Sequence, residues 1–321
     1  MIIRIMIFIF SILFFLSCNE KNNTLKGTEN KGANNLNDFL FVGMINENPG
    51  LYKYNFDNSE YNSFWSDNKE KVVDLSYSEG KKNVFFITAR NFVRSGAFPF
   101  IKNVRLYLIN PETKKADFLE ELGSGLQVFS HWEDENTFRI IINSFDNTIA
   151  NYVNHRVMLF NIYGKKLEDK TAIFDITKQG YPQLQDRKIN FISPDKKYLI
   201  ENRDTEVYLI GNETEELITK TSQQVRQIEW FDNFLFLSSI GIIPGTFKLI
   251  IYSLEKKKIL KLWEGTGVKN FFLTNDLIVF DKGFGDDSHI TIYDYINQKM
   301  FDEIIIDGGC GLRNITRIPE Y

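Results

Sequence analysis

The chain has 321 residues, of which 43% are hydrophobic and 25% are charged, so it can bury a sizeable core and is too apolar to be a disordered tail. Its formal net charge of −4 excludes a broad, positively charged surface that would bind nucleic acid. Two Cys exclude a disulfide framework and a Cys-rich zinc module, and three His disfavour a His-rich metal site. We expect no metal and no cofactor.

The first segment, 1–17, has the pattern of a secretory signal. Arg4 is followed by a nearly continuous apolar run that ends at Leu16, which is shorter than the roughly 20 residues that a membrane-spanning helix needs. A small residue, Ser17, then stands directly before Cys18 at the end of the run. We interpret 1–17 as a signal peptide.

The sequence Phe15-Leu16-Ser17-Cys18 resembles the lipobox of bacterial lipoproteins, with Phe15 where Leu is favoured and Leu16 where a small residue is favoured. The resemblance implies that Cys18 is linked to diacylglycerol, becomes the new N-terminus and is N-acylated, with palmitate for example. Each buried CH₂ would contribute about 0.8 kcal/mol, so several chains would anchor the protein durably. An ordinary signal peptide with an accidental Cys is the alternative.

Residues 18–37 are rich in Asn, Lys, Gly and Thr and have no apolar period, which predicts a flexible tether. By analogy with well-studied lipoproteins, Asn19 after the acylated Cys favours the outer membrane. We therefore expect a lipid-anchored protein of the bacterial cell envelope, with the periplasmic and surface sides both open.

Residues 38–321 read as many short strands, because the apolar segments are β-branched or aromatic and are bounded by polar clusters. One unit, a short apolar strand followed by a polar turn, recurs six times. The strands of this unit end at residues 55, 110, 161, 211, 253 and 294, with spacings of 55, 51, 50, 42 and 41. Repeats of roughly 40–50 residues with several strands each are typical of propeller blades.

A polar hairpin precedes most of these units. The clearest copy, Ile192–Ile200 (ISPDKKYLI), resembles the S-P-D-G-K-x-[IL] hairpin of TolB-like propellers, with Lys196 in place of the glycine. The first unit lacks this leading strand, and one strand is left over near the C-terminus, at 311–319. We predict an all-β, six-bladed β-propeller in which this C-terminal strand pairs beside Phe39–Val42 and closes the ring. Seven blades remain the alternative if 160–185 contains a further unit.

The longer connections are expected on one face of the ring, which is often the binding face of repeat proteins. They are 88–103, 143–154, 238–246 and 282–288. In the first, Arg90, Arg94 and Phe98 offer a cationic and aromatic contact patch, although its Phe residues can equally form a satellite cluster under the loop. The second offers sugar-binding groups in Asn143, Asp146 and His155, or an ordinary turn-rich loop.

The connection 282–288 contains Asp286 and Asp287, whose carboxylates suit either calcium binding or a solvated turn, and the spacing does not fit a calcium loop. No nucleophile, base and acid set is recognisable. We predict a monomeric, non-enzymatic binding or scaffold lipoprotein that recognises a protein, peptide or glycan. The alternative is a propeller hydrolase, lactonase or lyase with a carboxylate or Ca²⁺ site in the central channel.

Overall fold

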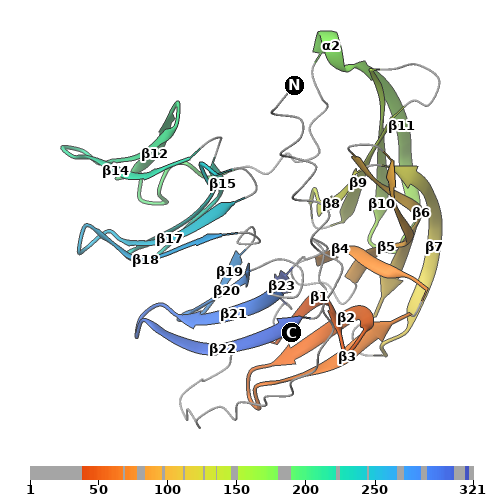
Figure 1. The fold of residues 1–321 in the computed structure, drawn as a ribbon, viewed down its shortest axis with the longest axis horizontal. Helices are drawn as coiled ribbons and strands as arrows, with labels where there is room; N and C mark the ends of the chain where they lie inside the picture. Colours follow the sequence, from red (N-terminus) through yellow and green to blue (C-terminus); the bar gives the residue numbers. More distant parts are fainter. Residues whose placement is uncertain are drawn as a thin grey trace, which may run out of the picture. The chain divides into compact units, whose positions relative to one another are not determined.

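The computed structural model of the chain describes residues 38–67, 69–77, 84–95, 98–110, 113–125, 127–134, 136–145, 151–179, 189–221, 225–243, 246–265, 271–282, 288–306 and 315–317. These residues form six antiparallel sheets, called sheets 1 to 6 below (Figure 1). Within the described ranges the helical structure is a single turn, α2 (Ile176–Gln179). The expectation of an all-β chain is confirmed.

Sheet 1 has the order β23-β1-β2-β3, and the other sheets contain strands that are consecutive in the chain: β4–β7, β8–β11, β12–β14, β15–β18 and β19–β22. The strands of sheets 1 to 3 are β1 (Phe39–Ile45), β2 (Asn48–Asn55), β3 (Glu60–Ser66), β23 (Ile315–Arg317), β4 (Lys71–Tyr77), β5 (Val84–Ser95), β6 (Phe98–Ile109), β7 (Ala116–Gly125), β8 (Gln127–Trp132), β9 (Thr137–Phe145), β10 (Tyr152–Asn161) and β11 (Lys166–Asp175). Those of sheets 4 to 6 are β12 (Leu199–Arg203), β13 (Glu206–Ile210), β14 (Glu215–Lys220), β15 (Val225–Phe231), β16 (Phe234–Ile240), β17 (Phe247–Ser253), β18 (Lys258–Gly265), β19 (Phe271–Thr274), β20 (Leu277–Lys282), β21 (Ser288–Asp294) and β22 (Lys299–Ile306).

The six recurring units found in the sequence occupy the same place in every sheet. They are β2, β6, β10, β13, β17 and β21, each of which pairs with the outermost strand. Burial is greatest in the two middle strands of a sheet and falls toward both edges: β16 and β17 are largely buried, whereas β15 and β18 are mostly half-buried or exposed. This pattern explains the apolar runs in the sequence, because the middle strands are covered on both faces.

In the hairpin turn of sheet 4, the residues that resemble the TolB-like motif stabilise the turn through side-chain hydrogen bonds. The Asp195 carboxylate accepts hydrogen bonds from Ser193 Oγ (2.7 Å) and from the Lys197 N–H (3.1 Å). Lys196 has φ of 60°, a left-handed conformation that glycine adopts more easily. In place of a regular first strand, sheet 4 has one isolated bridge between Ile192 and Leu199.

The expected loop over 88–103 is wrong, because these residues are mainly strand. β5 and β6 continue as a long hairpin in which Asn91 pairs with Lys102 and Ser95 pairs with Phe98. Its Arg, Asn and Ser residues resemble loop residues in sequence, whereas the aromatic and β-branched residues between them suit a strand. Asn143 and His155 also lie inside strands, β9 and β10, and not in the connection between them.

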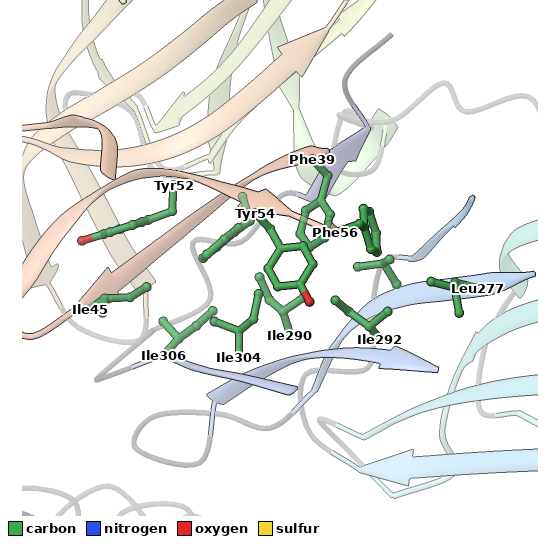
Figure 2. Close-up of a cluster of buried hydrophobic side chains, with 12 residues drawn as sticks. Phe39, Ile45, Tyr52, Tyr54, Phe56, Leu277, Ile290, Ile292, Ile304 and Ile306 are labelled. Carbon is green, nitrogen blue, oxygen red and sulfur yellow. The ribbon is translucent and has the colours of Figure 1, made fainter. Parts of the chain in front are cut away.

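Five clusters of buried side chains join consecutive sheets: 6 with 1, 1 with 2, 2 with 3, 4 with 5, and 5 with 6. Figure 2 shows the cluster of sheets 6 and 1, where Phe39 and Tyr54 of sheet 1 lie over Ile292 and Ile304 of sheet 6. Among the described residues, no comparable cluster joins sheet 3 with sheet 4. The hydrophobic core therefore consists of separate clusters, each between two neighbouring sheets, which we call seams.

Tyrosine hydroxyls add polar links at two of these seams. Tyr54 in β2 donates a hydrogen bond to Asp302 in β22, and Tyr252 in β17 donates one to Glu216 in β14. Both tyrosines hold the same position in the recurring unit, so one local pattern supplies the same link twice. Burial, and then the hydrogen bond to the acid, raises the pKa of both tyrosines.

The two ends of the described chain meet in sheet 1. β23 pairs antiparallel with β1, with Phe39 opposite Arg317, Leu40 opposite Thr316 and Phe41 opposite Ile315. β1 is thereby covered on both edges, by β23 and by β2. This is the pairing that was expected of the C-terminal strand.

We predict that Thr316→Pro destabilises the protein by about 1–3 kcal/mol, because proline removes a backbone donor from this short ladder. Thermal unfolding followed by circular dichroism measures the effect. Thr316→Val is the matched control, since valine keeps the N–H and favours a strand. Equal melting temperatures for the two variants would contradict the pairing.

Candidate functional site

Arg90, one of the predicted contact residues, lies against a buried carboxylate. Glu70 stands just before β4, and its side chain is only 2% exposed. It accepts hydrogen bonds from Thr88 Oγ1 (2.6 Å), Arg90 Nε (3.1 Å), Arg105 Nη1 (2.6 Å) and the Tyr107 hydroxyl (2.9 Å). Four donors from two strands, β5 and β6, thus converge on one acid.

The Glu70 carboxylate is held in its charged form. Burial by itself would raise its pKa, but the hydrogen bonds from Thr88, Tyr107 and Arg90 and the charge of Arg105 outweigh burial and lower the pKa. Arg105 also pairs with Glu121 at 3.0 Å. The cluster has balanced charges and satisfied acceptors, so it suits a role in holding sheet 2 together.

A second polar group lies on sheet 3. Residues alternate between the faces of a strand, and Phe138, Ile140 and Ile142 point into the cluster shared with sheet 2. Arg139 and Asn143 therefore lie on the other face. His155 is the cross-strand partner of Asn143, so it lies on that face too. This face also carries Ile141, Val153 and Val157, and we call it the polar face of sheet 3 after Arg139, Asn143 and His155.

The hydrogen bond between Asn143 and His155 determines the tautomer of the histidine. Asn143 is fully buried, and its Oδ1 lies 2.6 Å from His155 Nδ1. An amide oxygen only accepts, so His155 Nδ1 carries the hydrogen and Nε2 presents a lone pair. Burial, and then the charge of Arg139, lowers the pKa of His155, which keeps the imidazole neutral. The Phe174 ring meets the His155 ring edge-on at 5.5 Å between centroids.

Arg139 completes this face. Its guanidinium forms an ion pair with Glu133, while its Nε is buried and has no hydrogen-bond partner within the part of the chain that the structure describes. Sequence reasoning did not single out Arg139. The signal was present, because Arg139 and Asn143 are polar residues four apart in the apolar strand TFRIIIN and must share a face.

For the remaining predicted site residues, the structure describes no side-chain contacts. Arg94 and Phe98 lie in β5 and β6, but their side chains are outside the described part of the structure. Cys18, Asp146, Asp286 and Asp287 also lie outside the described residues. Within those that are described, no group of three or more His, Cys, Asp or Glu side chains could hold a metal ion. None of the described helical structure is long and apolar enough to cross a membrane.

Comparison with known proteins identifies a fold. No family model matches the sequence, and no curated protein matches it. The periplasmic gluconolactonase PpgL of Pseudomonas aeruginosa is similar in structure, with a TM-score of 0.50 and 9% identity over 88% of this chain and 99% of that one. TolB from Acinetobacter baumannii has a TM-score of 0.45 and 12% identity, over 85% of this chain and 64% of the TolB chain.

The β-propeller domain of the Trilobed protease from Pyrococcus furiosus is also similar, with a TM-score of 0.41 and 11% identity over 82% of this chain and 88% of that one. At such identities, structural likeness shows the fold alone. The six antiparallel sheets, together with the likeness to the gluconolactonase, define a β-propeller fold.

We predict that Glu70→Gln lowers the stability at pH 7 by about 3 kcal/mol, because it leaves Arg90 and Arg105 without their buried partner. The pKa of Glu70 is lower in the folded chain, so its contribution is full above the unfolded pKa and is lost as the pH falls through the folded value. The difference in the free energy of unfolding between Glu70→Gln and the native chain should therefore become smaller as the pH is lowered.

Urea unfolding between pH 3 and pH 7 measures this difference. Glu121→Gln is the matched control, since Glu121 is 45% exposed and contacts Arg105 alone. A stability difference for Glu70→Gln that stays constant over the whole range would contradict the assignment.

Proposed function

We propose that this chain is a lipid-anchored protein of the bacterial cell envelope whose six-bladed propeller binds a protein, peptide or glycan without catalysing a reaction. The polar face of sheet 3 carries the proposal. It holds a neutral, half-buried histidine whose Nδ1 is bonded to Asn143, and it lies outside the five apolar clusters. Groups of this kind form hydrogen bonds with a ligand and contribute little to a core.

Six blades and a closed ring are part of the proposal. The described residues form six sheets, five pairs of consecutive sheets share a core cluster, and β23 fills the inner edge of β1. These observations support a ring in which each sheet is one blade. Closure would protect the inner edges that a free sheet exposes to aggregation. We expect such a ring to be monomeric.

The anchor rests on the sequence around Cys18. The apolar run that ends at Leu16, the small Ser17 and the cysteine occur in the order that acylation needs. The tether over 18–37 would hold the propeller away from the membrane. The outer membrane is the proposed location, because Asn19 follows the cysteine.

The chain contains two cysteines, which allows a matched test of the anchor. In cells fed an alkyne fatty acid, the native chain and Cys310→Ser should incorporate the label and stay in the membrane fraction. Cys18→Ser should lose the label and leave the membranes after cleavage. Labelling of Cys18→Ser would contradict the proposal.

Binding is tested by immobilising the mature chain and applying an envelope extract and a glycan array. We predict that His155→Leu weakens the captured interaction about tenfold, or roughly 1.4 kcal/mol, because leucine cannot accept the hydrogen bond that Nε2 can accept. His289→Leu is the control, since His289 lies in sheet 6 and faces Glu303. Equal capture by the two variants would contradict the assignment of the site, and turnover of a lactone or ester would favour the hydrolase alternative.

A further inference from the structure

Four exposed lysines stand at two turns of sheets 5 and 6. Three of them are consecutive, at 256–258, in and directly after the turn between β17 and β18, and the fourth, Lys299, begins β22 after the turn that follows β21. Their ammonium groups form no ion pair within the ranges that the structure describes. By contrast, Lys166 and Lys220 on other outer strands pair with acids at 2.7 Å and 2.9 Å.

The two turns are close together in the fold. Phe234 is the cross-strand partner of Ser253, which directly precedes the first turn. The Phe234 ring packs on the ring of Tyr295, the first residue of the second turn, with 5.1 Å between centroids. Both rings belong to the seam between sheets 5 and 6. The four lysines therefore form one group at the end of two packed sheets.

Exposed apolar side chains stand next to these lysines. Ile259, Ile296 and Met300 are 40%, 47% and 49% exposed. We call residues 254–259 and 295–300 the basic patch, in which Glu255 is the one acid of the sequence. The inner turns of the same two sheets carry aspartates, so the excess of positive charge is confined to the outer turns.

The basic patch lies at the same end of the sheets as the start of β1. Phe39, the first residue of β1, is paired with Tyr54 near the end of β2. In the turn that follows, the Phe56 ring packs on Phe301, directly after the patch, with 6.2 Å between centroids. The expected tether over 18–37 therefore joins the described chain at this end of sheet 1, beside sheet 6.

We propose that the basic patch binds an anionic membrane surface and thereby orients the propeller on the bilayer. The inference deepens the proposed function and rests on it, because the acylated Cys18 brings the patch to a bilayer. A flexible tether of this length has a root-mean-square span of about 25 Å, which keeps the patch near the lipid. Ammonium groups attract anionic headgroups, and exposed apolar side chains enter the headgroup boundary. Protruding turns suit a flat surface, whereas a small ligand needs a concave site.

The opposite end of sheet 5 provides an internal comparison. Ile242 and Ile243 are exposed there, at 53% and 65%. The sequence 240–247 contains no lysine or arginine. Contact with a membrane through this end would therefore show no preference for anionic lipid, which separates it from contact through the basic patch.

Vesicle binding by the mature chain with Cys18→Ser tests the patch apart from the anchor, because this chain carries no acyl group. The probes are vesicles of phosphatidylcholine, with and without phosphatidylglycerol, and co-sedimentation measures the bound fraction. We expect binding to the vesicles that contain phosphatidylglycerol, and weaker binding at high salt. Lys257→Gln combined with Lys299→Gln should weaken it at least tenfold, since each lysine near an anionic surface contributes about a fivefold change.

Two matched controls isolate the patch. Lys69→Gln combined with Lys102→Gln removes the same charge from exposed lysines of the β3–β4 connection and of β6, and should leave binding unchanged. Ile296→Gln should weaken binding severalfold, whereas Ile243→Gln should not. All of these residues are exposed, and thermal unfolding verifies that each variant folds.

Three results would overturn the inference: no binding, equal binding to vesicles of phosphatidylcholine alone, or equal loss in the two double lysine variants. Binding that depends on Ile243 in place of the lysines would also overturn it and would assign membrane contact to the opposite end of sheet 5. None of these results touches the anchor, which the labelling of Cys18 measures separately. If Cys18 is unlabelled while the variants of the patch weaken vesicle binding, the anchor fails and the membrane affinity of the patch stands.

Discussion

Strand β1 begins the described chain and is covered on both faces, with Phe39, Leu40 and Phe41 fully buried. β2 fills one of its edges, so the other edge has to be filled by chain from elsewhere. β23 does this from the far end of the sequence. β1 supplies side chains to both of the clusters that sheet 1 shares with sheets 6 and 2, so its position determines both.

The architecture follows from local patterns that the sequence displays. The recurring apolar strand could be predicted from the sequence because a strand that is covered on both faces is a short, continuous apolar run. All six copies of this strand lie beside an outermost strand. The β5–β6 hairpin was missed because Arg90, Arg94 and Asn103 resemble loop residues in sequence. Long-range ladder pairing overrides that local preference.

The candidate site could be predicted from the sequence only in part. Asn143 and His155 were singled out for their hydrogen-bonding groups, but the bond between them depends on the register of β9 against β10, which no local signal determines. Glu70 was missed for the same reason, since its donors come from 18 to 37 residues away. The contrast between the five apolar clusters and the polar face of sheet 3 becomes visible only when each strand's residues are assigned to a face of the sheet.

The most direct test of the ring is the distance between the backbone protons of Leu40 and Thr316 in the mature chain, measured by nuclear Overhauser contacts with selective labelling. Pairing of β1 with β23 predicts a cross-strand contact between these two residues and between Phe41 and Ile315. Contacts from Thr316 to any other strand, or none at all, would contradict the account.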